Sequence, residues 1–312
     1  MELWQIILIA AAGAFFLFIV VPTVLAFIAV FIRKEAPTPE EYDWEKYKDH
    51  YYIPYVGRIL AARDTIKKRK CTEVEVTSYD GLKLYGDYYD MGAKRTAILF
   101  HGLGANMYLN FPAQAEFFCK NGFNVLLICQ RGHGKSKGRW TTIGLKEQYD
   151  VLTWIDWADK GGAEEIVIYG LSMGAAAIAY AADRIDNPKV RCMILDSCYY
   201  SIYEQMKRDA YKNHLPKILL FTEWVMAQLV LNVNIRASTA KAISKAKKPV
   251  LVIHGENDLT VDPKWGKLIY DSCPEPKEFL FVKNGPHTLN FLEAPELVGN
   301  TILSFINKYF NK

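Results

Sequence analysis

A serine flanked by small residues is the first candidate for chemistry in this sequence. Ser172 lies in the pattern G-x-S-x-G, as GLSMG at residues 170–174, and alanines follow it. Small residues on both sides of a serine suit a sharp turn from a strand into a helix, because larger side chains would collide there. Such a turn exposes the hydroxyl, which could then attack an acyl carbonyl as a nucleophile.

A nucleophilic serine needs a base that takes its proton and an acid that orients the base. Six histidines are present, and three of them follow Ser172. His214 lies in a long insertion and His254 ends a strand-like run, whereas His287 lies in the loop sequence KNGPHTLN after the last strand-like run. We therefore predict that His287 is the base, the alternative being an ordinary histidine of a surface loop.

The acid is sought after the serine and before the histidine, in the chain order typical of this arrangement. The sequence VIHGENDLTVDP at 252–263 ends a strand-like run and offers Glu256, Asp258 and Asp262. Asp262 precedes a proline and is typical of a helix N-cap, so Asp258 at the tip of the turn is the predicted acid. Asp196, in the sequence LDS at the end of the preceding run, is the alternative; it could instead bond the backbone at the base of the insertion.

Two backbone amides are needed to stabilise the negative charge that develops on the substrate oxygen. We predict the amide of Met173, directly after the serine, and the amide of Leu103, in the glycine-containing loop HGLGAN. His101 of that loop is interpreted as holding the loop in place. The sequence QRGHGKSKG at 130–138 lacks the spacing of a phosphate-binding loop, and a turn that shapes the floor of the site is predicted there.

The elements that must position these residues alternate along the chain. Strand-like stretches at 73–78 and 83–90 flank the turn Asp80-Gly81, which is typical of a hairpin. Continuous apolar runs, typical of strands buried on both faces, follow, and helix-length segments separate them. We predict an α/β fold in which a mostly parallel central sheet is sandwiched by helices. The apolar runs cover 96–102, 123–129, 164–170, 190–196, 249–255 and 278–284, and the helical segments cover 108–120, 145–160, 173–183, 263–271 and 292–308.

Two further segments frame the predicted hydrolytic domain, residues 72–312. A long apolar insertion separates the runs at 190–196 and 249–255, and we expect it to form a helical cap over about 198–240. An aromatic and charged connector, residues 33–71, precedes the domain. It is interpreted as a helical strap packed on the domain, the alternative being an interfacial segment whose lysines and Arg69 face anionic lipid.

The first 32 residues are predicted to form an uncleaved transmembrane anchor. No charge interrupts the sequence from Leu3 to Ile32, whereas spanning a bilayer takes about 20 apolar residues. A cleaved signal peptide is the alternative, but it would begin with basic residues and contain a shorter apolar run. Arg33 and Lys34 follow the span and no basic side chain precedes it, which predicts a single-pass protein of the cell membrane with its bulk on the cytoplasmic side.

Net charge and cysteine content bear on three other classes, which are nucleic-acid-binding, disulfide-rich and zinc-binding proteins. A net charge of +4 gives no indication of a nucleic-acid partner. The six cysteines show no C-x-x-C spacing, so neither a disulfide framework nor a structural zinc site is expected. No cofactor is predicted.

Several motifs together resemble one superfamily. HGLGAN, RGHGKSKG, YGLSMGAA, LDSCYYS, HGENDLTVDP and GPHTLNF occur in the order typical of α/β-hydrolases, and residues 72–310 are similar to the small bacterial membrane-anchored serine hydrolases among them. The resemblance implies Ser172 as nucleophile, His287 as base and Asp258 as acid, with Leu103 and Met173 as oxyanion donors. It does not fix the substrate, because one fold serves many reactions.

Three functions follow from this reading. A membrane-anchored serine hydrolase acting on carboxylic esters, including acyl-lipids or thioesters, agrees best with the apolar insertion beside an anchor, and its partner is a small acyl ester or a lipid. A serine peptidase with the same triad is the second, although no extra domain fits in 312 residues. A membrane scaffold of the same fold without catalysis is the third.

Overall fold

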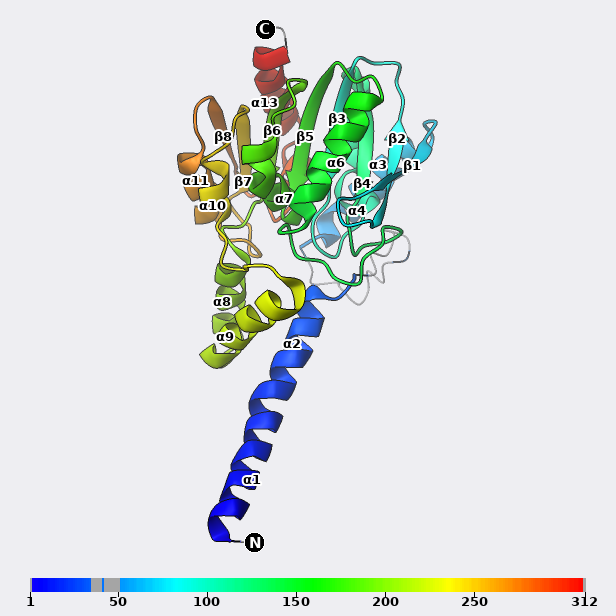
Figure 1. The fold of residues 1–312 in the computed structure, drawn as a ribbon. Coiled ribbons are helices and arrows are strands. Elements are labelled where there is room, and N and C mark those ends of the chain that lie inside the picture. The colour runs from blue at the N-terminus through cyan, green and yellow to red at the C-terminus, as the bar shows by residue number, and fades with distance from the viewer. Residues whose placement is uncertain (1, 35–40, 42–50, 311–312) are drawn as a thin grey trace. The chain divides into compact units, whose positions relative to one another are not determined.

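The chain is described by a computed structural model that covers residues 2–34, 41 and 51–310. These residues form two compact units, and Figure 1 labels most of their elements. The sheet unit comprises Arg33–Tyr200 and Ser238–Lys312, and the helical unit comprises Met1–Ile32 and Ser201–Ala237.

One eight-stranded sheet organises the sheet unit. Its strand order is β1-β2-β4-β3-β5-β6-β7-β8, with β1 and β2 antiparallel to their neighbours and the other six strands parallel. The predicted α/β class with a mostly parallel sheet is confirmed. The strands are β1 Thr72–Thr77, β2 Lys83–Tyr89, β3 Arg95–Phe100, β4 Phe123–Cys129, β5 Glu165–Leu171, β6 Val190–Asp196, β7 Val250–Gly255 and β8 Lys277–Val282.

Burial of the strands explains why the apolar runs are continuous. Every residue of β4 and β7 is buried, because helices cover both faces of the sheet. Alternate residues of β4, Val125 and Leu127, pack in one core with Phe118 and Phe305 of two covering helices. The edge strand β1, by contrast, contains no buried residue, and four of its six residues are exposed.

Helices cover the sheet on both sides. In Figure 1, α6 and α7 lie in front of the central strands, and α13 lies behind them. The helices of this unit are α3 Val56–Lys67, α4 Met107–Asn110, α5 Pro112–Lys120, α6 Glu147–Lys160, α7 Met173–Ala181, α10 Thr239–Ile243, α11 Pro263–Ser272, α12 Asn290–Glu293 and α13 Pro295–Phe310, with short 3₁₀ turns η2 Ile53–Tyr55 and η3 Ala182–Arg184.

The described part of the connector packs on the sheet unit. Ile59 and Ile66 of α3 are fully buried, and Ile66 belongs to the same core as Phe118 of α5. This is the packing that the strap interpretation predicts. Residues 35–40 and 42–50, which contain the proline pair and part of the aromatic cluster, lie outside the described residues.

The helical unit contains the apolar amino end and the insertion. Leu3–Phe31 is a continuous helical stretch of 29 residues that is long and apolar enough to cross a membrane, a property that a signal sequence shares. Within the unit, the helix that ends this stretch packs against one helix of the insertion. The elements are α1 Leu3–Phe15, the π turn η1 Phe16–Val20, α2 Val21–Phe31, α8 Ile202–Lys212, α9 Lys217–Met226 and the π turn η4 Ala227–Leu231.

Candidate active site

Ser172 occupies the sharp turn between β5 and α7. Its φ is +52°, a left-handed value that non-glycine residues rarely adopt. A Cβ atom at Gly174 would lie 2.0 Å from the carbonyl oxygen of Phe100, and one at Gly170 would lie 2.4 Å from the amide nitrogen of Ala175. Only glycine fits at either position, which is the physical reason for the small residues around the serine.

Three predicted site residues meet at the ends of three different strands. Nε2 of His287 lies 3.0 Å from Oγ of Ser172, and Nδ1 of His287 lies 2.7 Å from Oδ2 of Asp258. His287 follows β8, Asp258 follows β7, and Ser172 follows β5. The arrangement allows a proton to pass from the serine hydroxyl to an imidazole that a carboxylate orients.

The carboxylate of Asp258 is fixed from both sides. Its Oδ1 accepts hydrogen bonds from the amides of Val261, at 2.7 Å, and Thr260, at 3.0 Å, which leaves Oδ2 for His287. Burial alone would raise the pKa of Asp258, but the facing His287 and the neighbouring His254 lower it well below its usual range. Asp258 is therefore an ionised partner for the imidazole.

His254, which the sequence analysis sets aside as the base, is a buried neighbour of Asp258. Its Nε2 lies 3.3 Å from Oδ2 of Asp258, which is an ion-pair separation, but the ring is not aligned for a hydrogen bond. The residue is the last but one of β7 and is fully buried. We assign its effect on Asp258 to proximity.

Asp196, the alternative acid, has a different set of partners. Oδ1 accepts from Asn290 at 2.7 Å and from Ser197 at 2.9 Å, and Oδ2 accepts from the hydroxyl of Tyr169 at 2.9 Å. Burial raises the pKa of this carboxyl. Ser197 in turn accepts from the amide of Thr288, so Asp196 supports the loop of His287 from behind.

The predicted oxyanion donors lie on the two loops that flank the serine. The amide of Met173 begins α7, where backbone N–H groups have no partner within the helix. The amide of Gly102 donates to Oδ1 of Asn110 at 2.8 Å, and this bond helps to fix the loop that carries Leu103. Among the described residues, no hydrogen bond uses the amide of Leu103 or of Met173 as a donor.

Two buried histidines hold this loop. His101 is bonded to backbone on both sides, with Nδ1 2.8 Å from the carbonyl oxygen of Gly102 and Nε2 accepting from the amide of Gln130. Burial lowers the pKa of His101 to about 3, which keeps it neutral. His133 accepts from the amide of Gly104 at 3.1 Å. The interpretation of His101 as a loop-holding residue is therefore confirmed.

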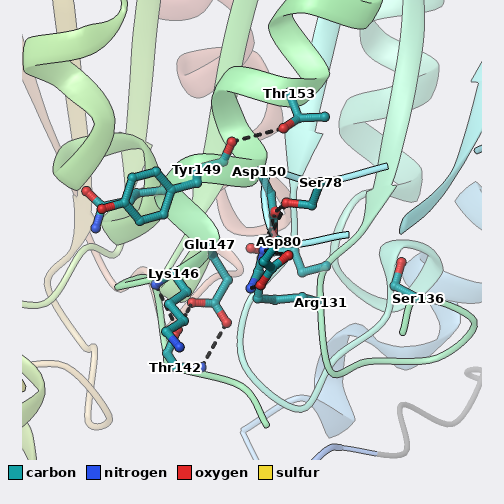
Figure 2. A network of polar contacts seen from close by, with 12 residues as sticks. Ser78, Asp80, Arg131, Ser136, Thr142, Lys146, Glu147, Tyr149, Asp150 and Thr153 are labelled. Atoms are coloured by element: carbon teal, nitrogen blue, oxygen red, sulfur yellow. Dashed lines mark hydrogen bonds and ion pairs between the residues drawn. The ribbon is translucent and has the colours of Figure 1, made fainter. Parts of the chain in front are cut away.

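An ionic cluster fixes the stretch 130–138. The guanidinium of Arg131 is almost fully buried and pairs with both oxygens of Asp150, with nitrogen–oxygen distances of 2.6 and 2.7 Å. Figure 2 shows Arg131 beside Asp80, whose Oδ2 lies 2.7 Å from Nη1, and beside Ser78. The glycines of this stretch thus form a structural turn around an arginine that sequence reasoning missed.

Tyr52 of the connector reaches both loops of the site. Its hydroxyl lies 2.7 Å from Oγ1 of Thr288, next to His287, and it accepts from Nδ2 of Asn110 at 3.1 Å. The same Asn110 holds the amide of Gly102. Sequence reasoning could not find this link, because an aromatic cluster among charges does not reveal which hydroxyl points inward.

Replacing Tyr52 with phenylalanine is expected to lower kcat on an ester roughly tenfold, with a smaller change in KM. A hydrogen bond contributes about 1 kcal/mol, and 1.4 kcal/mol is a factor of ten in rate. Tyr55→Phe is the matched control, because the Tyr55 hydroxyl bonds Glu293 and neither loop of the site. Equal effects of the two substitutions on kcat would contradict a positioning role for Tyr52.

Among the described residues, no group of three or more histidine, cysteine or acidic side chains is placed to hold a metal ion. The six cysteines are free thiols, and five of them are buried.

The chain has the α/β-hydrolase fold, and comparisons with known proteins show its similarity to that superfamily. Residues 97–215 match the family model described as the alpha/beta hydrolase fold. The solved Pyrococcus furiosus esterase Pf2001 superposes with a TM-score of 0.65 at 25% identity, covering 78% of this chain and 93% of that one.

Two relatives show how widely the similarity extends. The Escherichia coli O157:H7 protein YfhR is 26% identical over 246 residues, which is 75% of this chain and 81% of YfhR. The Danio rerio protein named lysophosphatidylserine lipase ABHD12 is 25% identical over 186 residues, covering 57% of this chain and 45% of that protein. Together with the similarity to the esterase Pf2001, these matches support a hydrolase.

Proposed function

We propose that this protein is a membrane-anchored serine hydrolase that cleaves carboxylic esters of small acyl compounds or lipids. The observation that carries the proposal is the hydrogen-bonded series from Ser172 through His287 to Asp258. The neighbour Pf2001 is named an esterase and the relative ABHD12 a lipase, which supports ester bonds as the substrate class. The apolar helix at Leu3–Phe31 supports an uncleaved anchor, and Arg33 and Lys34 after it favour a cytoplasmic hydrolase unit.

Each residue has one role in the proposed reaction. Oγ of Ser172 attacks the acyl carbonyl while Nε2 of His287 takes its proton, and Asp258 stabilises the imidazolium that forms. The amides of Leu103 and Met173 donate to the oxyanion. His287 returns the proton to the leaving alcohol, and an acyl group remains on Ser172. Water then attacks this acyl-enzyme by the same steps, which releases the acid and restores the serine.

Labelling with a fluorophosphonate tests the proposal directly. The reagent phosphonylates only an activated serine, so we expect the full-length protein to label and Ser172→Ala to remain unlabelled. His287→Ala should label far more slowly. Ser272→Ala is the matched control, because that hydroxyl donates to a carbonyl of its own helix. A folded wild-type protein that does not label would contradict the hydrolase and favour the scaffold.

The leaving group is tested by comparing substrates on wild-type enzyme that has not been treated with the fluorophosphonate. p-Nitrophenyl esters of increasing chain length, a thioester and a peptide amide are offered at equal concentration. We expect ester hydrolysis to exceed amide hydrolysis. Faster cleavage of the amide would replace the esterase with the peptidase alternative.

A further inference from the structure

Helix α9 of the insertion, with its continuation η4, is apolar on two opposite faces. One face is buried within the structure and carries Leu220, Ala227 and Leu231. The opposite face carries Phe221 and Leu229, which are 50% and 77% exposed, and Ile218 and Val230 are also about half exposed. A helix that is apolar all round is found where its surroundings are apolar, in a protein core or in a membrane. Water does not provide such surroundings for the exposed face.

The distribution of charge on α9 agrees with a lipid environment. Its one acidic side chain, Glu223, lies on the packed face and is 2% exposed, so no carboxylate interrupts the apolar face. Lys217 begins the helix, and Lys212 ends α8 just before it. Lysines at the ends of an apolar segment can extend to the headgroups of a bilayer.

Packing within the helical unit favours a lipid bilayer as the apolar surroundings of the exposed face of α9. Helix α9 packs on α2, the end of the stretch that is long and apolar enough to cross a membrane. The hydroxyls of Thr23 and Thr222 lie 2.7 Å apart across this contact. Each hydroxyl also lies near a carbonyl of its own helix, Ile19 at 2.7 Å and Leu219 at 3.0 Å. In hydrocarbon no water is available, so a hydroxyl group must form its hydrogen bonds within its own helix or with a neighbouring helix.

The position of Thr23 along the anchor gives the depth of this contact. The first charged side chain after the anchor is Arg33, whose guanidinium donates to the carbonyl of Ser136 in the sheet unit. Thr23 precedes Phe31 by two turns of helix, or about 12 Å at 1.5 Å per residue. A contact at that distance from the polar end lies inside a hydrocarbon layer that is about 30 Å thick.

We propose that α9 inserts its exposed apolar face into the bilayer beside α2, so that cap and anchor form one lipid-contacting element. This inference rests on the membrane anchoring included in the proposed function. The chain leaves β6 at Asp196 to enter the insertion and returns through α10, and β6 pairs with β5, the strand that precedes Ser172. The substrate class that fits is an acyl ester resident in the membrane.

Site-directed fluorescence in vesicles tests the insertion. Cys71 is the exposed cysteine and the other five are buried, so a Cys71→Ser background accepts one new labelled cysteine at a time. Phe221→Cys and Leu229→Cys report on α9, and Leu17→Cys, in the anchor, is the positive control. Leu297→Cys on α13 of the sheet unit is the matched negative control, because that leucine is 51% exposed. Each full-length variant carries a nitrobenzoxadiazole label in phosphatidylcholine vesicles.

Phospholipids brominated in their acyl chains quench only labels that reach the hydrocarbon. We expect the intensity at 221 and 229 to fall about twofold, as at 17, because interfacial helices bury their apolar face about 5–10 Å deep. The label at 297 should not respond. Quenching at 17 alone would overturn the insertion of α9 and leave the anchor standing. No quenching at 17, 221 or 229 would overturn both, whereas fluorophosphonate labelling of Ser172 tests the hydrolase independently.

The substrate class has its own test in the same vesicles. The double variant Phe221→Asp/Leu229→Asp is compared with Leu297→Asp on a vesicle-borne long-chain ester and on a soluble short-chain ester. We expect the ratio of the two rates to fall about tenfold in the double variant, because charged groups are excluded from hydrocarbon. An unchanged ratio would overturn access to the substrate through the inserted cap.

Discussion

Asp258→Asn is expected to lower kcat about 10⁴-fold, the loss typical of a triad aspartate replaced by its amide. An amide in place of Oδ2 presents an N–H group to Nδ1 of His287, which then takes the wrong tautomer and cannot accept the proton of Ser172. The amides of Val261 and Thr260 still find an oxygen to bond, so the fold should be retained. The measurement is kcat on a soluble ester, with thermal unfolding as a check of folding.

Asp196→Asn provides the comparison for this prediction. Asp196 is fully buried and accepts from Tyr169, Ser197 and Asn290, so its substitution removes acceptors from a network behind the loop of His287. We expect a loss of stability and a smaller loss of kcat. Near-full activity of Asp258→Asn together with an inactive but folded Asp196→Asn would mean that the wrong acid has been assigned.

The choice between these two acids shows where sequence reasoning stops. Asp196 ends β6 and Asp258 follows β7. Because the carboxyl ends of adjacent parallel strands meet at one sheet edge, chain order alone allows either residue to face the histidine. The two residues differ in their hydrogen bonds. Asp258 accepts from the amides of Thr260 and Val261 in its own turn, whereas Asp196 accepts from side chains of distant segments such as Asn290. Turn geometry after a strand is not encoded in hydrophobic periodicity.

Other features were predictable because they depend on local rules. Continuous apolar runs predict buried parallel strands, and the small residues around Ser172 predict a turn into which no Cβ fits. Tyr52 and Arg131 follow no such rule. Their partners, Asn110 and Asp150, are remote in sequence, and only the packed fold brings them together.

Arg131→Met is expected to lower the free energy of unfolding by about 3–5 kcal/mol, the usual loss when one partner of a buried ion pair is removed. Asp150 would keep a buried carboxylate without its bidentate partner (Figure 2). Lys94→Met is the matched control, because its pair with Glu164 is largely exposed and such pairs contribute about 0–1 kcal/mol. Urea unfolding followed by circular dichroism measures both. A loss no greater than that of Lys94→Met would contradict a structural role for this pair.

The destabilisation of Arg131→Met should also depend on pH. Burial raises the pKa of Asp150 to about 6 even though Arg131 opposes the rise. A carboxyl whose pKa is higher in the folded state than in the unfolded state loses stability as the pH rises through the folded value. Removing Arg131 removes the opposing charge, so the pKa of Asp150 should rise further. The decrease in the free energy of unfolding should then continue to higher pH than in the wild type. We therefore expect Arg131→Met to be closer to wild type at pH 5 than at pH 8, whereas Lys94→Met should show little change between the two.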